Sequence, residues 1–342
     1  MKMKFNFKPD FRTEIPVYEQ IKKYIVEGVS NGEMKGGTPL PSINKLKQSL
    51  GIASGTVYRA YEELRLQGVL VSQQGKGYFI AEKELMLKPK VFLLFDRMNA
   101  YKEILYESFL EGLEKKADVS VFFHHYDFHR FEQLIRDNKG RYTHFVVMPH
   151  LYENPIKVLK LLPTERLILI DANVEGILNG SGVYQDFETD IYTGLKSGVD
   201  WISRYKKIRL SLSSSRFQYV PEGCIAGFKR FCTDSGLDGS VLPNLAEDIL
   251  KHNELYIVFS DAELIMALKY MRRARLKPGK DIGIISYDDT PMKEILEGGI
   301  AALSTDFRQM GLTAAAMVLG NCSGRVHNPF NLIVRPSMIR EI

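Results

Sequence analysis

Apolar residues recur at helical spacing near the start of the chain. Val17, Ile21, Ile25 and Val29 fall on one face of a helix, because residues three or four positions apart lie on the same side. The spacing predicts a helix over residues 16–31. A segment rich in glycine and proline, "NGEMKGGTPLP", follows and predicts a break.

The stretch "LPSINKLKQSLGIASGTVYRAYEEL" at residues 40–64 predicts a short helix, a tight turn and a longer helix, with the apolar residues on one side. Ser42 and Ser54 open the two helices, and we expect each serine to cap its helix. The next segment, "GVLVSQQGKGYFIAEK", alternates apolar and polar residues on either side of "QQGKG", which predicts a β-hairpin. The N-terminal region, residues 1–81, is therefore expected to form three helices and a hairpin.

After a charged segment at residues 82–90, which we assign as a linker, short apolar runs alternate with amphipathic stretches. The expected strands are "KVFLLF", "VSVFF", "HFVVM", "RLILI", "IRLSL", "LYIVF", "IGIISY" and "AALS". The expected helices cover residues 101–116, 187–205, 225–236, 262–275 and 307–319. Wholly apolar strands alternating with helices predict parallel sheets covered on both faces. Because residues 91–342 exceed one ordinary domain, we expect an α/β fold of two lobes with a cleft between them.

The positive charge of the chain is concentrated in its N-terminal quarter. Residues 1–80 contain 12 Lys and Arg against 7 Asp and Glu, whereas residues 81–342 contain 34 of each. A positive segment attached to a neutral remainder is typical of a protein that neutralises DNA phosphates with one end. A chance cluster of surface lysines is the alternative explanation for so small an excess.

The second helix of the pair has a polar outer face near its start. If Val57 and Leu64 point to the core, then Thr56, Tyr58 and Arg59 point outward, where a recognition helix contacts base edges and phosphates. The hairpin presents a lysine between two glycines at its tip, which suits a wing in the neighbouring groove. A helical pair that merely closes a core is the simpler alternative, but it explains neither the wing nor the charge.

Residues 15–81 resemble the winged helix-turn-helix of the GntR family of bacterial transcription regulators. The resemblance rests on the motifs P-x-Y-x-Q-I, G-x-x-L-P-S, T-V-x-R-A-Y-x-x-L and G-K-G-x-F. It implies binding to double-stranded operator DNA through Ser42, Thr56, Tyr58, Arg59, Lys76 and Gly77. Many members have arginines where this chain has Asn44, Ser54 and Tyr58. Guanine contacts worth roughly 1–3 kcal/mol each are then missing, and we expect an operator richer in A·T pairs.

Polar residues follow several expected strands at their carboxyl ends: Asp96, Asp171, Ser260 and Asp288. Ligands bind beyond these ends in open parallel sheets, and carboxylates there can accept hydrogen bonds from the hydroxyls of a neutral sugar. An acidic residue at such a place can instead cap the next helix, which we expect of Asp261 and Asp289.

Residues 91–342 resemble, less closely, the sugar-sensing domain of LacI-type repressors, which has the fold of periplasmic sugar-binding proteins. The clearest points are "GFKRF", "VFSDAELIMALKYMRRARLKPGKDIGIISYDD" and "STDFRQMGLTAAAMVL". A GntR head on a LacI-type body is similar in arrangement to arabinose repressors. The resemblance implies ligand contacts by Asp171 and Asp288, with Thr305 and Phe307 at further cleft positions.

The resemblance has one notable departure. LacI-type domains usually hold an arginine three residues before the "GF" glycine, where it anchors the sugar, and here that position is Cys224. The candidates to replace it are Arg97, Arg216 and Glu222. A different mode of ligand binding is the other explanation.

No motif indicates catalysis, a metal or a cofactor. The chain has no complete phosphate-binding loop and no G-x-S-x-G, and its three cysteines form no Cys-x-x-Cys. His124, His125 and His129 lie close together. Adjacent histidines on a strand point to opposite faces, however, and we expect a solvated edge there. We therefore expect no enzyme and no cofactor.

These patterns predict a cytoplasmic transcription regulator, because no segment approaches the roughly 18 apolar residues of a spanning helix. The expected partners are operator DNA, a small effector and a second copy of the chain in a homodimer. We expect a repressor of carbohydrate-utilisation genes that a monosaccharide or sugar phosphate releases. The alternative is a DNA-binding regulator whose effector pocket is vestigial or binds a metabolite other than a sugar.

Overall fold

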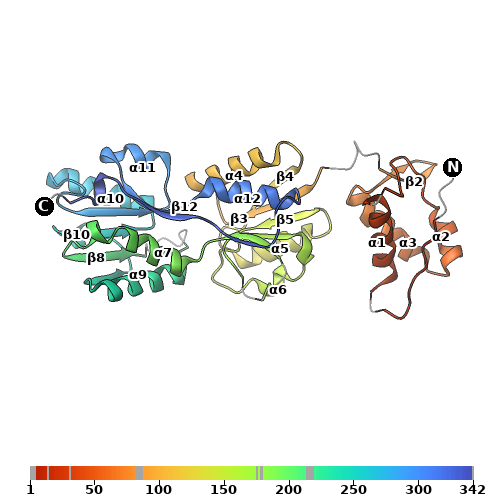
Figure 1. Cartoon of the computed structure of the whole chain (residues 1–342), viewed down its shortest axis with the longest axis horizontal. Coiled ribbons are helices and arrows are strands. Elements are labelled where there is room, and N and C mark those ends of the chain that lie inside the picture. Colours follow the sequence, from red (N-terminus) through yellow and green to blue (C-terminus); the bar gives the residue numbers. More distant parts are fainter. Residues whose placement is uncertain are drawn as a thin grey trace.

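A computed structural model of the chain describes residues 5–13, 15–30, 32–81, 88–174, 176–177, 180–212 and 219–340. The described part forms an N-terminal head and two larger α/β lobes (Figure 1). The fold class predicted from the apolar pattern is confirmed. The segment assigned as a linker, residues 82–90, lies mostly outside the described residues.

The head contains three helices and a two-stranded hairpin. They are α1 (Val17–Ser30), α2 (Ile43–Leu50), α3 (Ser54–Leu66), β1 (Leu70–Gln73) and β2 (Gly77–Ile80). The predicted apolar faces meet in its core, where Ile21 and Ile25 of α1 and Val57, Tyr61 and Leu64 of α3 are fully buried. The helix-turn-helix architecture predicted from the sequence is confirmed.

The two predicted serine caps have different outcomes. Ser42 caps α2, because its side chain accepts a hydrogen bond from Lys45 N. Ser54 does not cap α3, and that part of the prediction is wrong. Ala53 keeps the extended backbone of a cap residue and makes no side-chain cap bond, so α3 begins one residue early and takes Ser54 into its first turn.

The first lobe is a parallel sheet between two layers of helices, with strand order β13–β7–β6–β5–β3–β4. Its strands are β3 (Lys90–Phe95), β4 (Asp118–Phe123), β5 (His144–Val147), β6 (Leu167–Asp171), β7 (Ser181–Tyr184) and β13 (Arg325–His327). Its helices are α4 (Ala100–Leu113), α5 (Phe128–Asn138), α6 (Ile156–Leu159), η2 (Thr164–Arg166) and α12 (Phe307–Val318). Helices α4 and α12 cover one face of the sheet, and α5 and α6 cover the other.

Strand β3 shows why its sequence is apolar at successive positions. Val91 and Leu93 pack under α4 and α12, whereas Phe92 and Leu94 pack under α5 and α6. Side chains of a strand alternate between its faces, so a strand covered on both sides needs apolar residues throughout. The run "KVFLLF" is therefore typical of a parallel strand that is covered on both faces, as predicted.

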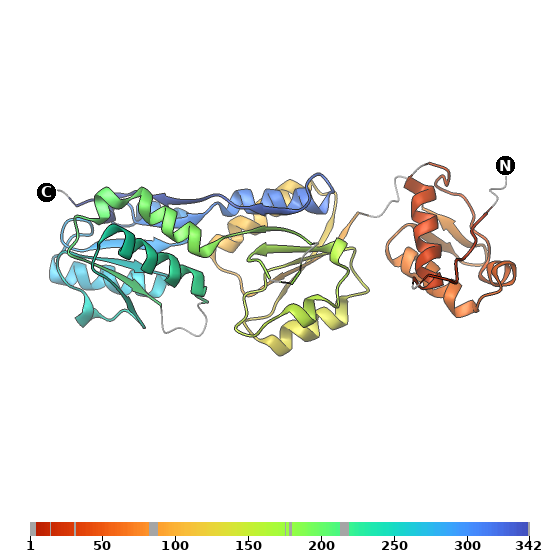
Figure 2. The ribbon, with the colours of Figure 1, turned by 60° about the horizontal axis from the view of Figure 1, so that its bottom comes forward.

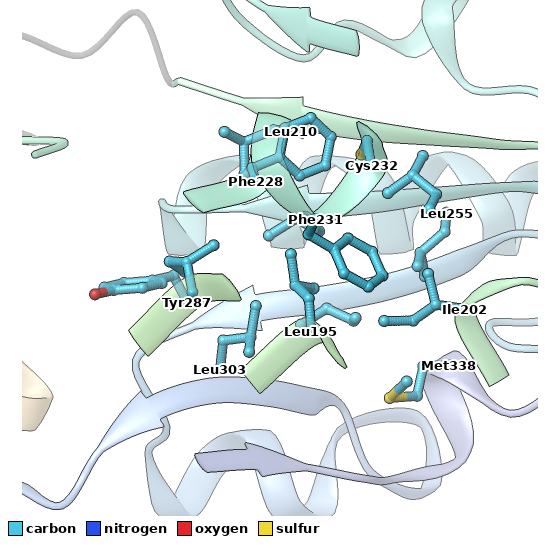
Figure 3. Packing of buried hydrophobic residues seen from close by; sticks show 14 of the residues in the cluster. Leu195, Ile202, Leu210, Phe228, Phe231, Cys232, Leu255, Tyr287, Leu303 and Met338 are labelled. Carbon is cyan, nitrogen blue, oxygen red and sulfur yellow. The ribbon is translucent and has the colours of Figure 1, made fainter. Parts of the chain in front are cut away.

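The second lobe has the strand order β14–β12–β11–β10–β8–β9, in which only β14 is antiparallel among the described strands. Its strands are β8 (Lys207–Ser211), β9 (Gly239–Leu242), β10 (Glu254–Val258), β11 (Gly283–Tyr287), β12 (Ala301–Thr305) and β14 (Phe330–Ile333). Its helical segments are α7 (Phe187–Ser197), α8 (Val199–Ile202), α9 (Glu222–Ser235), η3 (Glu247–Ile249), α10 (Asp261–Ala274), α11 (Pro291–Ile295), η4 (Leu296–Gly298) and η5 (Pro336–Met338). Figure 3 shows its core, where Phe228 and Phe231 of α9 gather with Leu195 and Leu210.

The structure corrects the predicted elements at several places. One helix was expected over residues 187–205, but Gly198 separates α7 from α8. A Cβ at Gly198 would lie 2.2 Å from Leu332 Cδ2, so the side chain of Leu332 on β14 packs into the space that glycine leaves. Strands β7, β9, β13 and β14 were not predicted. Each has four residues or fewer, which is too short for a clear apolar run.

The described chain passes between the lobes at residues 185–186, 305–306 and 328–329 (Figure 2). The crossings are tied together by hydrogen bonds. Asn328 Nδ2 donates to Thr305 Oγ1 at 2.7 Å and to Asp306 O at 2.8 Å, and Asp306 N donates to Pro329 O at 2.9 Å. The lobes thus share one bonded hinge, a geometry suited to opening and closing around a ligand. None of the described helices combines the length and the apolar composition that crossing a membrane requires.

Helix α12 approaches α4 closely at Gly311. A Cβ there would lie 2.2 Å from Ser108 Oγ and 2.4 Å from Leu105 O. We expect Gly311→Val to force the helices apart and to lower the free energy of unfolding by about 1–3 kcal/mol, measured by urea denaturation. Gly140 is the control, because its Cβ position is open. Equal destabilisation by Gly140→Val would contradict the packing argument.

Candidate functional site

The outer face of α3 carries residues that the sequence assigned to DNA. Tyr58 is 54% exposed, and Thr56 is half-buried in the first turn of the helix. Gly55 leaves that start open, since nothing lies within 4 Å of its Cβ position. Ser42 is exposed at the start of α2. An open helix N-terminus with small residues lets backbone amides approach a phosphate.

Arg59 also lies on the outer face of α3, but it is held by other side chains. Its Nε donates to Glu63 Oε1 at 2.9 Å, and its guanidinium donates to Tyr18 Oη at 2.8 Å. The guanidinium carbon lies 3.7 Å from the centre of the Tyr18 ring. Glu63 also accepts from Lys22 Nζ at 2.6 Å. Arg59 must therefore exchange these partners for phosphate or base if it contacts DNA.

The predicted wing is the turn between β1 and β2. Lys76 N donates to Gln73 O at 2.9 Å and closes the turn. Gly75 and Gly77 have φ angles of 75° and 97°, a left-handed backbone that favours glycine. Lys76 and Gly77 are exposed at its tip. The turn chemistry thus places one ammonium group at the end of the hairpin.

Three of the expected ligand residues converge between the two lobes. Asp96 follows β3 and Asp171 ends β6 in the first lobe, whereas Asp288 follows β11 in the second. All three line one small cavity of about 20 Å³, here named the aspartate cavity, which has room for about one water molecule. Asp96 and Asp288 do not cap the next helices, because the N-cap positions of α4 and α11 are Asn99 and Thr290.

Two of these aspartates have an unusual backbone. Asp171 has a φ angle of 71° and Asp288 one of 60°, both in the left-handed region. Aspartate tolerates the left-handed region better than most residues, but residues other than glycine adopt it only uncommonly. The two residues occupy the ends of central strands in different lobes. Backbone strain of this kind recurs where a side chain must be aimed into a site.

Asp96 and Asp171 share a buried network of partners. The fully buried Lys102 Nζ contacts Asp96 Oδ1. His150 Nδ1 lies 3.2 Å from Asp96 Oδ2, and His150 Nε2 lies 3.3 Å from Asp171 Oδ2. Burial alone would raise the pKa of Asp96, but Lys102 and His150 outweigh it and hold that pKa well below its usual range. Tyr219 of the second lobe stacks on His150 at 5.1 Å between ring centres, which joins the lobes.

Asp288 has the opposite charge preference. Burial, followed by the nearby charge of Asp171, raises the pKa of Asp288 to about 8, although Lys293 lowers it. Its carboxyl group is therefore mostly protonated at neutral pH. The two lobes bring Asp171 and Asp288 together in the aspartate cavity, and the proton on Asp288 reduces the repulsion between the two carboxyl groups.

A second cavity, here named the α10 cavity, adjoins the aspartate cavity and has a volume of about 480 Å³. The two cavities share Tyr101, Tyr287 and Asp288. Arg97 lines the α10 cavity from the first lobe, and Ser260 lines it from the second. The volume lies within the roughly 300–1,000 Å³ of small-molecule sites, so this cavity has room for a ligand.

Ser260 has a second role at the start of α10. Its Oγ accepts from Glu263 N at 3.1 Å and caps the helix. The expectation that Asp261 and Asp289 cap the next helices is wrong. Asp261 is the first residue of α10 and pairs with Lys293 at 3.2 Å. Asp289 pairs with Arg335 at 2.7 Å instead.

Thr305 and Phe307 line neither cavity among the described residues. Thr305 Oγ1 donates to Pro329 O at 3.1 Å and belongs to the hinge. Phe307 is buried and stacks on Tyr101 at 4.5 Å between ring centres. The two residues therefore support the cleft from behind, through the hinge and through Tyr101.

The position of the missing arginine is closed to ligand. Cys224 is fully buried, and its Sγ lies 3.9 Å from Tyr287 Oη. Figure 3 shows Tyr287 extending away from the core of the second lobe with its hydroxyl outermost. Of the three candidate replacements, Arg97 lines the α10 cavity and Glu222 is exposed at the start of α9. Arg216 lies outside the described residues.

The histidine cluster differs from the solvated edge that was expected. His124 is fully buried, and its Nε2 lies 3.2 Å from Met148 O. Burial lowers the pKa of His124 to about 4, so it is neutral. Strand β4 ends at Phe123, and the alternation rule does not extend to the histidines. His125 and His129 are exposed.

Several residues around the aspartates were missed from the sequence: Tyr101, Lys102, Tyr126, His150, Gln185, Tyr219 and Tyr287. The same strand-end rule would have found His150, three residues after β5. Gln185, whose Nε2 contacts Asp171 Oδ1, follows the unpredicted strand β7. Lys102 lies on α4 and is brought to Asp96 by the turn of that helix, a contact that no motif marks.

The chain has relatives among characterised families. Residues 17–80 match the bacterial regulatory proteins of the gntR family, and residues 205–340 match the periplasmic binding protein-like domain. The chain is 30% identical over 107 residues to the HTH-type transcriptional repressor YtrA of Bacillus subtilis (strain 168), which covers 31% of this chain and 80% of YtrA. It is 39% identical over 66 residues to the uncharacterized HTH-type transcriptional regulator YdeL of the same organism, covering 19% of this chain and 14% of YdeL.

Solved structures resemble the two-lobed body. The trehalose repressor from Escherichia coli aligns with a TM-score of 0.58 and 16% identity, covering 72% of this chain and 99% of that one. A dimeric Lac repressor with an 11-residue C-terminal deletion aligns with a TM-score of 0.59 and 14% identity, covering 73% and 99%. Identity this low shows the fold alone. The expected LacI-type architecture of the body is confirmed.

The raised pKa of Asp288 makes stability depend on pH. Its pKa rises from 3.8 to about 8 on folding, so the folded chain binds this proton more tightly and loses stability as pH rises between those values. We expect Asp288→Asn, which carries no charge at any pH, to raise the Tm at pH 8, and we expect this advantage to shrink as the pH falls toward 4. Thermal unfolding at several pH values measures this. Asp234→Asn, at an exposed position of α9, should leave the profile unchanged. An unaltered profile in Asp288→Asn would count against the raised pKa of Asp288.

Proposed function

We propose, on the premise that this chain belongs to the gntR family of bacterial regulatory proteins, that it is a cytoplasmic repressor of carbohydrate-utilisation genes released by a sugar. The observation that carries the proposal is the joining of a helix-turn-helix head to a body whose two lobes both contribute carboxylates to one cleft. The body shares its fold with a trehalose repressor, which supports a sugar as the class of effector. A sugar phosphate is included in the proposal.

The head supplies the DNA-binding half of the proposal. Thr56 and Tyr58 on α3 are the candidates to face bases, and Ser42, Lys76 and Gly77 are the candidates to face phosphates. Arg59 joins them if DNA displaces Tyr18 and Glu63 from its guanidinium. Such an exchange replaces one charged partner by another, so its net gain is smaller than that of an unengaged arginine.

A second copy of the chain is the proposed protein partner. One small head makes few phosphate contacts and would hold DNA weakly at cellular salt. Helix α11 presents Met292 and Ile295 with 62% and 78% of their surfaces exposed, and Ile265 of α10 is 44% exposed. Apolar side chains of this size on the surface support a protein contact, and the Lac repressor that shares the fold is dimeric.

The hinge supplies the proposed coupling between effector and DNA. The aspartate cavity holds about one water, so a ligand that reaches Asp171 must separate the lobes or rearrange their side chains. Movement at the hinge would change the spacing of two heads in a dimer. Operator affinity then falls if the effector binds one dimer geometry more tightly than the other.

A second candidate function is a regulator whose pocket is vestigial or takes a metabolite other than a sugar. Two observations favour it. Cys224 is buried where LacI-type domains usually have an arginine. Asp96 is already neutralised within the chain by Lys102 and His150, which reduces its demand for ligand hydroxyls.

The wing gives a direct test of DNA binding. We expect Lys76→Ala to weaken binding to a fragment of the promoter region of the chain's own gene and to reduce the salt slope by about 1, because one phosphate contact is lost. Fluorescence anisotropy at a series of salt concentrations measures both quantities. Lys229→Ala on α9 removes the same charge from the body and should change neither. An unchanged slope in Lys76→Ala would contradict the role of the wing.

The cleft gives a direct test of sensing. A monosaccharide or sugar phosphate present at about 100 times its Kd should stabilise the chain by about 2.7 kcal/mol in a thermal-shift assay. The same compound should lower operator affinity. We expect Asp171→Asn to reduce both effects, whereas Asp234→Asn should reduce neither. A flat response to every sugar and sugar phosphate would favour the vestigial pocket.

A further inference from the structure

The α10 cavity contains a buried acid that the sequence did not single out. Glu263 is the third residue of α10, lines the cavity and is 8% exposed. Its Oε1 accepts from Ser211 Oγ and from Leu245 N, each at 2.8 Å. Its Oε2 is buried and has no hydrogen-bond partner among the described residues. One oxygen of the carboxyl group is thus held by two hydrogen bonds, whereas the other, although buried, makes none within the described part of the chain.

Asp288 lines the same cavity and, among the described residues, has a second oxygen without a partner. It is 6% exposed, and its Oδ1 also lacks a hydrogen-bond partner within the described part of the chain. An unpaired buried carboxylate oxygen costs free energy until a donor reaches it. Glu263 Oε2 therefore favours a ligand that brings a donor, whereas the mostly protonated carboxyl group of Asp288 can either donate or accept a hydrogen bond.

The cations around this cavity are already engaged. Lys293 Nζ donates to Asp288 O at 2.5 Å and to Tyr287 O at 3.1 Å, and it lies 3.2 Å from Asp261 Oδ1. Arg97 interacts with Tyr126 on the first lobe. An incoming phosphate or carboxylate would compete for these cations and would also meet the carboxylate of Glu263.

We infer that Glu263 binds the effector directly, and that the effector is an unphosphorylated molecule rich in hydroxyl or ammonium donors. This inference rests on the proposed sensing function and narrows its choice between a sugar and a sugar phosphate. The anchor is an acceptor on α10, because the position that usually holds the cationic anchor is the buried Cys224. The proposed anchor is thus a hydrogen-bond acceptor, whereas LacI-type domains of the same fold usually have a cationic donor as the anchor.

The test uses the purified full chain and matched sets of probes. One set is D-glucose, D-glucosamine, glucose 6-phosphate and gluconate, and the other is D-ribose, L-arabinose and ribose 5-phosphate. Isothermal titration calorimetry gives each Kd. We expect a neutral or amino sugar to bind, and its phosphorylated or carboxylated counterpart to bind about tenfold more weakly or worse.

Glu263→Gln keeps the size of the side chain and an oxygen for Ser211 and Leu245, but it removes the charge. We expect it to weaken binding of the preferred sugar about tenfold or more. Glu247→Gln, at a half-exposed acid of the same lobe, should not. Without effector, both variants should bind the operator with the same affinity and the same dependence on salt as the unmodified chain. Unchanged operator binding reports that the variants are folded. If Glu263→Gln does not fold, the comparison of phosphorylated and unphosphorylated probes on the unmodified chain decides.

The outcomes separate this inference from the proposed function. Tighter binding of the phosphorylated or carboxylated probes, or an unchanged Kd in folded Glu263→Gln, overturns the inference and leaves the sensing function standing. Preference for an amino sugar over the neutral sugar supports it and assigns the donor as ammonium, and the reverse preference assigns it as hydroxyl. No binding by any probe overturns both the inference and the sensing function, but not the DNA-binding half.

Discussion

The burial of carboxylates between two lobes is the constraint on which the body depends. Asp96, Asp171 and Asp288 lie at the carboxyl ends of parallel strands and are almost wholly removed from water. A buried carboxylate must be paired or protonated, because burial of an isolated charge is very unfavourable. The chain pairs Asp96 with Lys102 and His150 and keeps a proton on Asp288. A ligand that enters the cleft changes this balance, which links binding to the positions of the lobes.

In the head, as in the body, a charged side chain placed for binding already has partners within the chain. Arg59 lies on the helix face suited to DNA, but Tyr18 and Glu63 hold it in a stacked and hydrogen-bonded position. The proposed contact of Arg59 with DNA would therefore be an exchange of partners at this residue. At the wing, Lys76 is presented by a glycine turn. Arg59 and Lys76 therefore differ in how much each would add to the proposed affinity for DNA.

A shared fold does not decide what a pocket binds. The body shares its fold with a trehalose repressor, but the two chains are only 16% identical. Cys224 is buried in the core with its Sγ 3.9 Å from Tyr287 Oη, and Glu263 lines the α10 cavity with one oxygen unpartnered within the described residues. Function in such folds is set by a few side chains on a common scaffold. The polarity of those side chains is what selects the chemical class of the ligand.

The sequence by itself determined the elements and their order. Apolar residues at helical spacing predicted α1 and α3, and wholly apolar runs predicted β3 and other central strands. These patterns are local because the buried positions of an element repeat with the period of that element. The strand-end rule then placed Asp96, Asp171 and Asp288 at one edge of each sheet. Only the tertiary structure decided which groups meet there. Four features depend on residues distant in the chain: the bridge through His150, the burial of Cys224, the hydrogen bond that holds Arg59 to Tyr18, and the unpartnered oxygen of Glu263. No local pattern encodes contacts of that range.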